Sequence, residues 1–259
     1  MHILFSSKID ASSNPAKVLS ENWFSQKGEE WVYGKHVMVN TKVDMILDVP
    51  TDYESGGLVV LSTHKSEKEY PTLTVHVPGN WNKAEMGGEP RTLNTVMGGK
   101  MKEILLGLDA GNRKYSLGWN VNMEVDHHGP TCKAPIMFVE IGSSEKEWKN
   151  PVAAKIVAEA VMRMLESDSV YDSYFCVGGG HYSQKFTKLG LEDAQRAAGH
   201  ILPKYQAPNL GMDTFRQAME KSVEETKGVL IEKKGVRKEH RELIEKFAKE
   251  YGTETEIIR

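Results

Sequence analysis

The predicted fold is organised around residues 124–131, which read Glu-Val-Asp-His-His-Gly-Pro-Thr. Residues 119–123 before this stretch alternate like a strand, and the apolar run 135–142 after it is typical of a buried strand. The Gly-Pro pair is a turn signal, so the stretch marks a break in a sheet. Neighbouring strand residues point to opposite faces, and His127 and His128 can therefore share one site only if the backbone is irregular there.

The totals favour a globular protein and exclude some partners. The chain has 259 residues, with 39% hydrophobic and 27% charged content, which is ordinary for a soluble domain. Its net charge of −3 gives no global basic field, so a nucleic-acid partner would need a local basic patch. Cys132 and Cys176 are too few for a disulfide framework. There is no signal-peptide pattern and no membrane-spanning apolar run, and we expect a cytoplasmic protein with no membrane partner.

The order of predicted elements indicates an α/β layer fold. Apolar runs at 2–7, 44–49, 58–63, 73–77, 135–142 and 174–177 predict strands, and helical patterns at 16–23, 100–108 and 151–165 lie between them. Gly111 is expected to end the second helix. Residues 82–99 form a long loop, which is usually functional or mobile. We expect one domain over 1–259, with a charged helical segment over 213–259 packed on it and an edge strand at 256–258.

Histidines follow predicted strands at five places. They are His64, His76, the pair His127 and His128, His181, and His200. Ligands of open α/β sheets gather outside the carboxyl ends of the strands, which is where such side chains would meet. A single histidine is more often a structural residue, but the recurrence favours an active-site rim.

Residues 178–180 are three glycines directly after a strand. Their backbone N–H groups could hold an oxyanion, or the glycines could form a tight turn with positive φ, and both interpretations stay open. The spacing fits neither a dinucleotide fingerprint nor a Walker loop. No nucleophile elbow or cysteine signature occurs, although Thr131 and Cys132 near His128 leave a small possibility of a protein nucleophile.

A metal site has weak support from spacing, since no His-Glu-x-x-His or paired-cysteine motif occurs. Histidines could still converge with Glu140 or Asp126 into a zinc-type set, and zinc would explain the missing nucleophile. A basic run near the C-terminus is most simply a solvated helix face, because glutamates are interleaved with it. It comprises Lys227, Lys233, Lys234, Arg237, Lys238 and Arg241. Lys185, Lys188 and Arg196 are better placed to meet a nucleic acid.

Five blocks in fixed order resemble the archaeal and plant type of D-aminoacyl-tRNA deacylase. The blocks are Ser62-Thr63-His64-Lys65-Ser66, Leu73–His76 with Gly79-Asn80, Val125–Thr131, Phe138–Ser143, and Gly178–Tyr182 with Lys185-Phe186-Thr187. The resemblance extends from the first strand to Pro203, and several co-linear blocks are far more specific than one motif.

The resemblance implies hydrolysis of the ester that joins a D-amino acid to the 3′ end of tRNA, with broad side-chain tolerance. It also implies a monomer and a three-layer sandwich around a central mixed, largely parallel sheet, related in layout to phosphorylase and peptidyl-tRNA hydrolase. The family is described as zinc-dependent, with two Zn²⁺ ions per subunit. Family members often have Thr where this chain has Asp126, which leaves the role of that carboxylate open.

We expect three sets of site residues. The catalytic set is His127, His128, His181, Glu140 and Thr131, with Glu140 orienting an imidazole. The substrate-binding set is Gly179, Gly180, Tyr182, Lys185, His64 and Lys65. The metal set is His76, His128, His181 and His200. Two other functions remain as alternatives: a zinc-dependent amidohydrolase or phosphorylase-like enzyme acting on a small metabolite, and a non-catalytic protein that binds the tRNA end.

Overall fold

The computed structural model describes residues 1–54, 56–65 and 70–259, so Ser66 of the first resemblance block lies outside the described residues. The chain forms two compact units, each assembled from three segments. The first unit contains Met1–Val75, Glu103–Asn122 and Cys132–Ser167, and the second contains His76–Lys102, Met123–Thr131 and Asp168–Arg259.

The first unit is built on a mixed eight-stranded sheet. In spatial order the strands are β2 (Ser25–Lys27), β3 (Glu30–Tyr33), β4 (His36–Asn40), β1 (His2–Phe5), β5 (Leu58–Thr63), β10 (Ile136–Gly142), β6 (Thr72–His76) and β9 (Asn120–Met123). Strand β1 pairs in parallel with β4 and β5, and β5 pairs in parallel with β10, whereas β2, β3 and β4 are antiparallel. The predicted α/β fold with a mixed, largely parallel sheet is confirmed.

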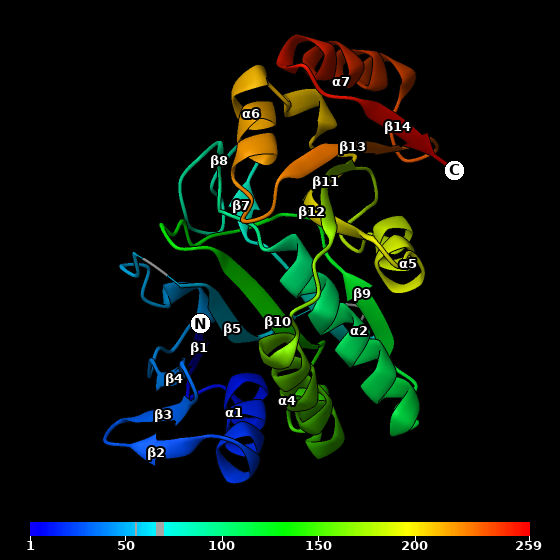
Figure 1. Ribbon diagram of the computed structural model, residues 1–259. Coiled ribbons are helices and arrows are strands. Elements are labelled where there is room, and N and C mark those ends of the chain that lie inside the picture. The colour runs from blue at the N-terminus through cyan, green and yellow to red at the C-terminus, as the bar shows by residue number, and fades with distance from the viewer. Residues whose placement is uncertain (55, 66–69) are drawn as a thin grey trace. The chain divides into compact units, whose positions relative to one another are not determined.

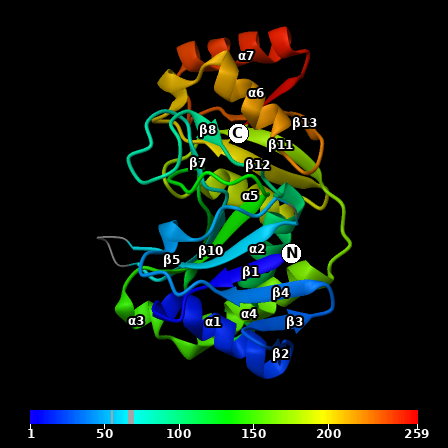
Figure 2. The ribbon, with the colours of Figure 1, turned by 90° about the vertical axis from the view of Figure 1, so that its left-hand side faces the viewer.

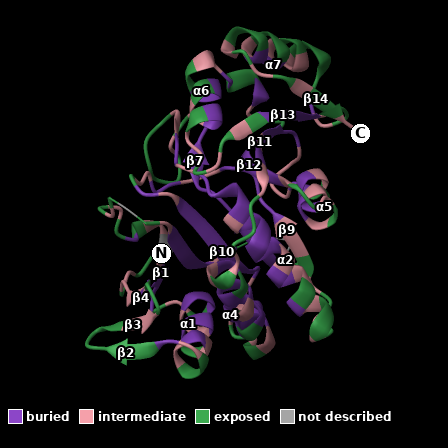
Figure 3. Cartoon of the chain, viewed as in Figure 1, coloured by how far each residue is buried: buried purple, intermediate pink, exposed green. Residues whose placement is uncertain are grey.

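Strands β5 and β10 are apolar because both of their faces are covered. Helices α1 (Asp10–Asn22) and α4 (Pro151–Glu166) pack against each other and on these two strands, as Figures 1 and 2 show. On the other face lies an apolar cluster that includes Leu4, Val60 and Phe138. Figure 3 shows β10 buried along its length. Helix α4 begins where expected, since Pro151 occupies its first turn and the Asn150 side chain accepts two backbone N–H groups.

Two local predictions for this unit were wrong. Residues 44–49 carry the 3-10 helix η1 (Ile46–Asp48), and β4 is the strand beside β1. Aspartates are poor strand residues and Pro50 follows, so the run does not join the sheet. Helix α2 (Gly98–Lys114) continues past Gly111, because this glycine faces α4, where an added Cβ would lie 2.8 Å from Ile156.

We predict that Gly107→Ala destabilises the protein, although alanine is the better helix former in isolation. A Cβ at Gly107 would lie 2.7 Å from the Cα of Ala160 on α4, and a backbone atom cannot move aside cheaply. Such overpacking costs about 1–3 kcal/mol. Thermal unfolding should show a lower Tm than the wild type. An equal or higher Tm would contradict the close approach of α2 and α4.

The second unit is built on a four-stranded parallel sheet. The strand order is β12 (Arg196–Leu202), β11 (Asp172–Val177), β13 (Thr226–Glu232) and β14 (Thr255–Ile258). Helix α5 (Gln184–Glu192) packs against β12. Helices α6 (Met212–Glu220) and α7 (Lys238–Tyr251) lie together beside the sheet in Figure 1. They bury Phe215 and Ile244 against Phe175, Val229 and Trp81.

The remaining elements are short. They are the hairpin of β7 (Gly79–Asn80) and β8 (Thr92–Leu93), helix α3 (Glu145–Trp148) and the 3-10 helix η2 (Ala207–Asn209). The segment 213–259 is not helical throughout, since β13 lies between α6 and α7. The apolar core of β13 is only Val229, Leu230 and Ile231, and the charged residues on both sides of it made this strand difficult to predict. The expected edge strand is β14. No helix within the described residues is long and apolar enough to cross a bilayer.

Candidate active site

Residues 123–127 are held by backbone hydrogen bonds to three other segments of the second unit. Val125 N–H donates to the His181 carbonyl (3.1 Å), and Asp126 N–H donates to the Ile201 carbonyl of β12 (3.0 Å). The His127 carbonyl accepts from Gly79 N–H (3.2 Å). The segments that carry His76, His181 and His200 therefore converge on the stretch that carries His127 and His128.

His127 and His128 share one site because the backbone leaves the strand conformation at His128. This residue has φ 46°, in the left-handed region that a non-glycine residue adopts at a cost of about 1–2 kcal/mol. The two ring centroids consequently lie 4.4 Å apart instead of on opposite faces. The irregularity that the sequence required is therefore present at the second histidine.

Four imidazoles form a cluster, with His127 in contact with the other three: His76, His128 and His181. The His127 ring centroid lies 4.5 Å from that of His76 and 4.6 Å from that of His181, and the His76 and His128 centroids are 4.9 Å apart. His76 is 1% exposed, so one side of the cluster is buried. One ring nitrogen from each of His76, His127 and His128 lies within 4.8 Å of the other two, a spacing that could hold a metal ion.

The tautomers of these three rings follow from their backbone contacts. Nδ1 of His76 lies 3.2 Å from the Val77 carbonyl, Nδ1 of His127 lies 2.8 Å from the Val125 carbonyl, and Nδ1 of His128 contacts the Gly129 carbonyl. A carbonyl oxygen can only accept, so each Nδ1 carries the hydrogen and each Nε2 keeps its lone pair. Metal-binding histidines are commonly oriented in this way, by a hydrogen bond from the other ring nitrogen.

Glu124 is the carboxylate of this cluster. Its Oε2 lies 3.1 Å from Nε2 of His181 and 3.5 Å from Nε2 of His127, and the residue is 1% exposed. We did not expect Glu124 among the site residues. Its position three residues before His127 was a usable signal, because the strand ends there and the chain turns.

His127 is held neutral. Burial lowers the pKa of His127 well below its usual range, and the neighbouring His76 and His128 lower that pKa further. A neutral imidazole can accept a proton or bind a metal ion at physiological pH.

We predict that this shift makes the metal-free protein less stable in mild acid. Below about pH 6.5 His127 binds a proton in the unfolded chain but not in the folded protein. The free energy of unfolding therefore falls as the pH drops, by at most about 1.4 kcal/mol per pH unit for one group. The Tm measured with a chelator between pH 7.5 and about 5 should fall less steeply for His127→Gln than for the wild type. Parallel curves would contradict the assigned charge state.

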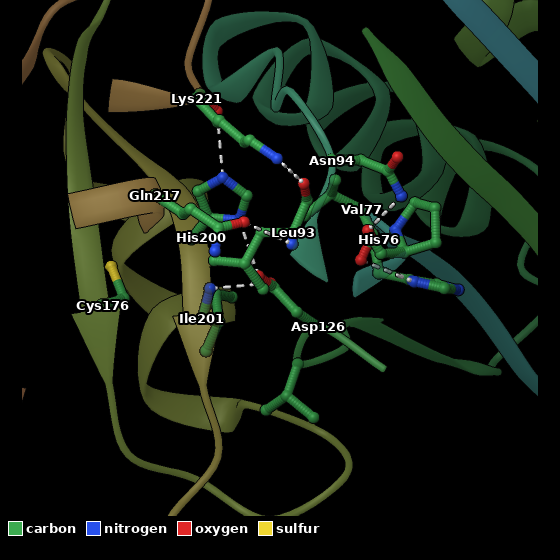
Figure 4. Close-up of polar contacts among 12 residues, drawn as sticks. His76, Val77, Leu93, Asn94, Asp126, Cys176, His200, Ile201, Gln217 and Lys221 are labelled. Atoms are coloured by element: carbon green, nitrogen blue, oxygen red, sulfur yellow. Dashed lines mark hydrogen bonds and ion pairs between the residues drawn. The ribbon is translucent and has the colours of Figure 1, made fainter. Parts of the chain in front are cut away.

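Asp126 and His200 form a separate buried pair, seen in Figure 4. Nδ1 of His200 lies 2.7 Å from Oδ2 of Asp126, and its Nε2 donates to the Lys221 carbonyl (3.0 Å). Oδ1 of Asp126 accepts from Ile201 N–H (2.8 Å). Both ring nitrogens of His200 are thus engaged by protein acceptors, and this histidine has no nitrogen to offer the metal set in which we expected it.

Asp126→Asn should therefore destabilise the second unit. The change removes the carboxylate that both His200 and Ile201 contact in a buried place, and breaking such a pair costs about 3–5 kcal/mol. Chemical denaturation measures the loss. Asp168→Asn, at an exposed position of the same unit, is the control that should leave stability within about 0.5 kcal/mol. Equal stabilities of the two variants would show that the pair carries no structural role.

A pocket of about 130 Å³ opens beside His127 and His128. Its other lining residues come mainly from two loops and are Gly79, Asn80, Trp81, Lys83, Glu85, Met86, Asp126, Tyr205 and Gln206. The long loop that follows β7 therefore contributes to the wall of the site. Trp81 anchors the start of this loop, since its ring stacks on Phe175 at 5.6 Å.

The glycine loop and Thr131 make structural contacts. Gly178 and Gly179 have φ of 143° and 79°, which require glycine. The Gly179 N–H donates to Oε2 of Glu232 (2.8 Å), so it is not available to the oxyanion for which we considered it. The Thr131 hydroxyl accepts from Glu89 N–H (2.8 Å), which ties it to the long loop.

The other expected substrate-binding residues have these places. Tyr182 pairs with Glu124 through a β-bridge, and its ring lies 5.2 Å from that of His181. Lys185, on α5, donates to the carbonyl of Arg259 (2.6 Å). Gly180 stands between the engaged Gly179 and His181, and a Cβ added there would meet no atom within 4 Å.

In the first unit, Glu140 contacts an imidazole, and that imidazole is His64. Oε2 of Glu140 lies 3.5 Å from Nδ1 of His64, and Oε1 accepts from the Ser62 hydroxyl (2.8 Å). Gly142 is needed beside them, since a Cβ there would lie 2.8 Å from the His64 side chain. Lys65 is exposed.

Neither cysteine is suited to nucleophilic catalysis. Burial raises the pKa of the Cys176 thiol well above its usual range, with a smaller contribution from Asp126, and burial also raises the pKa of Cys132. The Cys132 thiol donates to the Thr51 carbonyl (3.5 Å). The thiolate, which is the reactive form, is therefore disfavoured at both positions.

Four clustered imidazoles beside a buried carboxylate, on an α/β scaffold, are the kind of groups that a hydrolase site contains. The family model for D-aminoacyl-tRNA deacylase matches residues 51–256. The chain belongs to this family, which confirms the resemblance found in its sequence blocks.

Relatives match along nearly the whole chain. The D-aminoacyl-tRNA deacylases of Pyrococcus furiosus and Pyrococcus horikoshii are 36% and 37% identical to it, each with 98% of both chains covered. The crystal structure of a conserved protein of unknown function, AF0625, is 27% identical with a TM-score of 0.87, covering 99% of this chain and 94% of that one.

Proposed function

We propose that the protein hydrolyses D-aminoacyl-tRNA to a free D-amino acid and tRNA, with broad tolerance of the D-side chain. The observation that carries the proposal is the set of three imidazoles with Nδ1–H bound to backbone carbonyls, next to the Glu124 carboxylate. Membership of the D-aminoacyl-tRNA deacylase family supports the choice of substrate. The alternative of a small-metabolite amidohydrolase or phosphorylase-like enzyme is not favoured, because the relatives are named for aminoacyl-tRNA.

The side chains of the cluster have complementary tasks in ester hydrolysis. Glu124 accepts a proton from the water that adds to the ester carbonyl. His181, 3.1 Å from Glu124, carries that proton to the departing ribose oxygen. An aminoacyl ester is already activated, so correct positioning and a modest base are sufficient, and no covalent intermediate on a side chain is needed.

The residues fit a resident metal ion, and we propose zinc at His76, His127 and His128. Their nitrogen spacing, their fixed tautomers and the neutral state of His127 all suit a d¹⁰ cation that prefers imidazole. When bound, zinc supplies a Lewis acid and brings the pKa of water to about 7. The three side chains hold their Nε2 lone pairs in place by their backbone contacts, whether or not the ion is bound.

The chirality of the substrate is proposed to be enforced by space. A pocket of about 130 Å³ beside the imidazoles leaves little room for a side chain in the wrong direction, so L-aminoacyl esters are rejected sterically. We also propose that the enzyme acts as a monomer in the cytoplasm, where aminoacyl-tRNA is used.

The deciding experiment compares D-Tyr-tRNA with L-Tyr-tRNA as substrates of the wild type and of Glu124→Gln. The wild type should release D-tyrosine much faster than L-tyrosine, and the variant should lose about 10²–10⁴-fold in kcat, as expected for a lost general base. Glu192→Gln, an exposed position on α5, should retain full activity. D-Tyr-tRNA that stays intact with zinc present would refute the proposal.

A substitution of His128 distinguishes the proposed hydrolase from a protein that only binds tRNA. His128→Ala should abolish hydrolysis while tRNA binding persists. In a non-catalytic binder of the tRNA end, the same change would leave the cellular resistance to D-tyrosine unaltered. Metal analysis of His76→Gln, which should bind less zinc than the wild type, tests the ligand set without relying on activity.

A further inference from the structure

A second pocket of about 710 Å³ lies in the second unit, with lining residues other than those of the pocket beside His127 and His128. It is lined by Lys185, Glu232, Lys233, Lys234, Arg241 and Arg259. Five of these six side chains are cationic. Pockets of roughly 300–1,000 Å³ are of the size that binds ligands.

The cations of this pocket differ from the other basic residues of the same segment. Arg237 contacts Glu239 (3.8 Å) and Lys238 contacts Glu242 (3.5 Å), as the interleaved sequence leads one to expect. In the described part of the chain, by contrast, the five pocket cations have no carboxylate side chain within 4 Å. Lys185 contacts the Arg259 carbonyl, and Arg241 contacts the Lys233 carbonyl (3.0 Å). The glutamates therefore neutralise one part of the basic run and leave the pocket positive.

Glu232 links the pocket to the candidate active site. Its carboxylate accepts the Gly179 N–H (2.8 Å), and the glycine loop leads within two residues to His181, which contacts Glu124. A Cβ on Gly178 or Gly235 would lie within 2.5 Å of the Glu232 side chain, so glycine at both positions leaves room for this carboxylate. A polyanion bound in the pocket would thus lie against the strand and loop that position a catalytic histidine.

We propose that this pocket binds phosphates of the tRNA backbone, an inference that rests on the proposed function and assigns part of its substrate-docking surface. A chain with net charge −3 gives RNA no general attraction, so affinity must come from a local group of cations. Among the described residues, the pocket lysines and arginines have no Asp or Glu side chain as an ion-pair partner that phosphate would have to displace. The planar Arg241 guanidinium also suits phosphate geometry. The pocket unites Lys185 with Lys233 and Lys234, which lie 48 and 49 residues away in sequence.

The test is a matched pair of double charge reversals. Lys233→Glu with Lys234→Glu changes the pocket, and Arg237→Glu with Lys238→Glu makes the same change of charge at the paired residues nearby. Binding of deacylated tRNA is measured by fluorescence anisotropy over a range of salt concentrations. The pocket variant should weaken binding at least about tenfold and make the plot of log K against log salt shallower by about 1–2, because each lost phosphate contact removes about 0.7–0.9. The control should change the affinity less than about threefold.

Equal losses in the two variants would mean that only net charge matters and would overturn the proposal, as would unchanged binding in the pocket variant. Lys233→Ala with Lys234→Ala, which introduces no new repulsion, should give the same direction with a smaller effect. A second readout is the ratio of kcat/KM on D-Tyr-tRNA to kcat/KM on D-tyrosyl-adenosine, which should fall in the pocket variant. If the wild type hydrolysed neither ester, the proposed function would fail, yet the tRNA titration would still decide the pocket.

Discussion

The architecture of the candidate site depends on one constraint: the backbone of residues 123–127 is buried and must find hydrogen-bond partners after it leaves the sheet. It finds them in three segments, at Gly79, at His181 with Ser183, and at Ile201. Asp126 strengthens the last of these by adding its carboxylate to the Ile201 N–H. Each of the three segments carries or adjoins a histidine, so satisfying the backbone also assembles the imidazoles.

Histidine serves two different purposes within this small region, and the acceptors around each ring decide which. His200 has a carboxylate at Nδ1 and a carbonyl at Nε2, so both nitrogens are committed to structure. His76 and His127 each have a backbone carbonyl at Nδ1, so the lone pair of each ring is on Nε2. The left-handed backbone conformation of His128 places its ring beside that of His127. Hydrogen bonds of the neighbouring residues offset the free energy that this conformation costs.

The charges in the second unit also depend on the neighbours of each side chain. Burial keeps His127 neutral among three other imidazoles, and the Glu124 carboxyl group lies beside His127 and His181. Along the C-terminal basic run, Arg237 and Lys238 form ion pairs with glutamates. The cations that line the pocket with Glu232 are those to which we assign phosphate binding.

The sequence by itself determined the fold class, the family and the segments that carry chemistry, since strand periodicity, turn residues and co-linear motifs are local properties of the chain. Only the tertiary structure decided which side chains meet. It placed Glu124 with His127 and His181, Asp126 with His200, Glu140 with His64, and Lys185 with Lys233. It also revealed β13 within residues 213–259, where the sequence predicted helices followed by an edge strand at 256–258. The physical reason is that periodicity reports which face of one element a residue occupies, whereas a site is made by hydrogen bonds between elements tens of residues apart, and no local pattern records those partners.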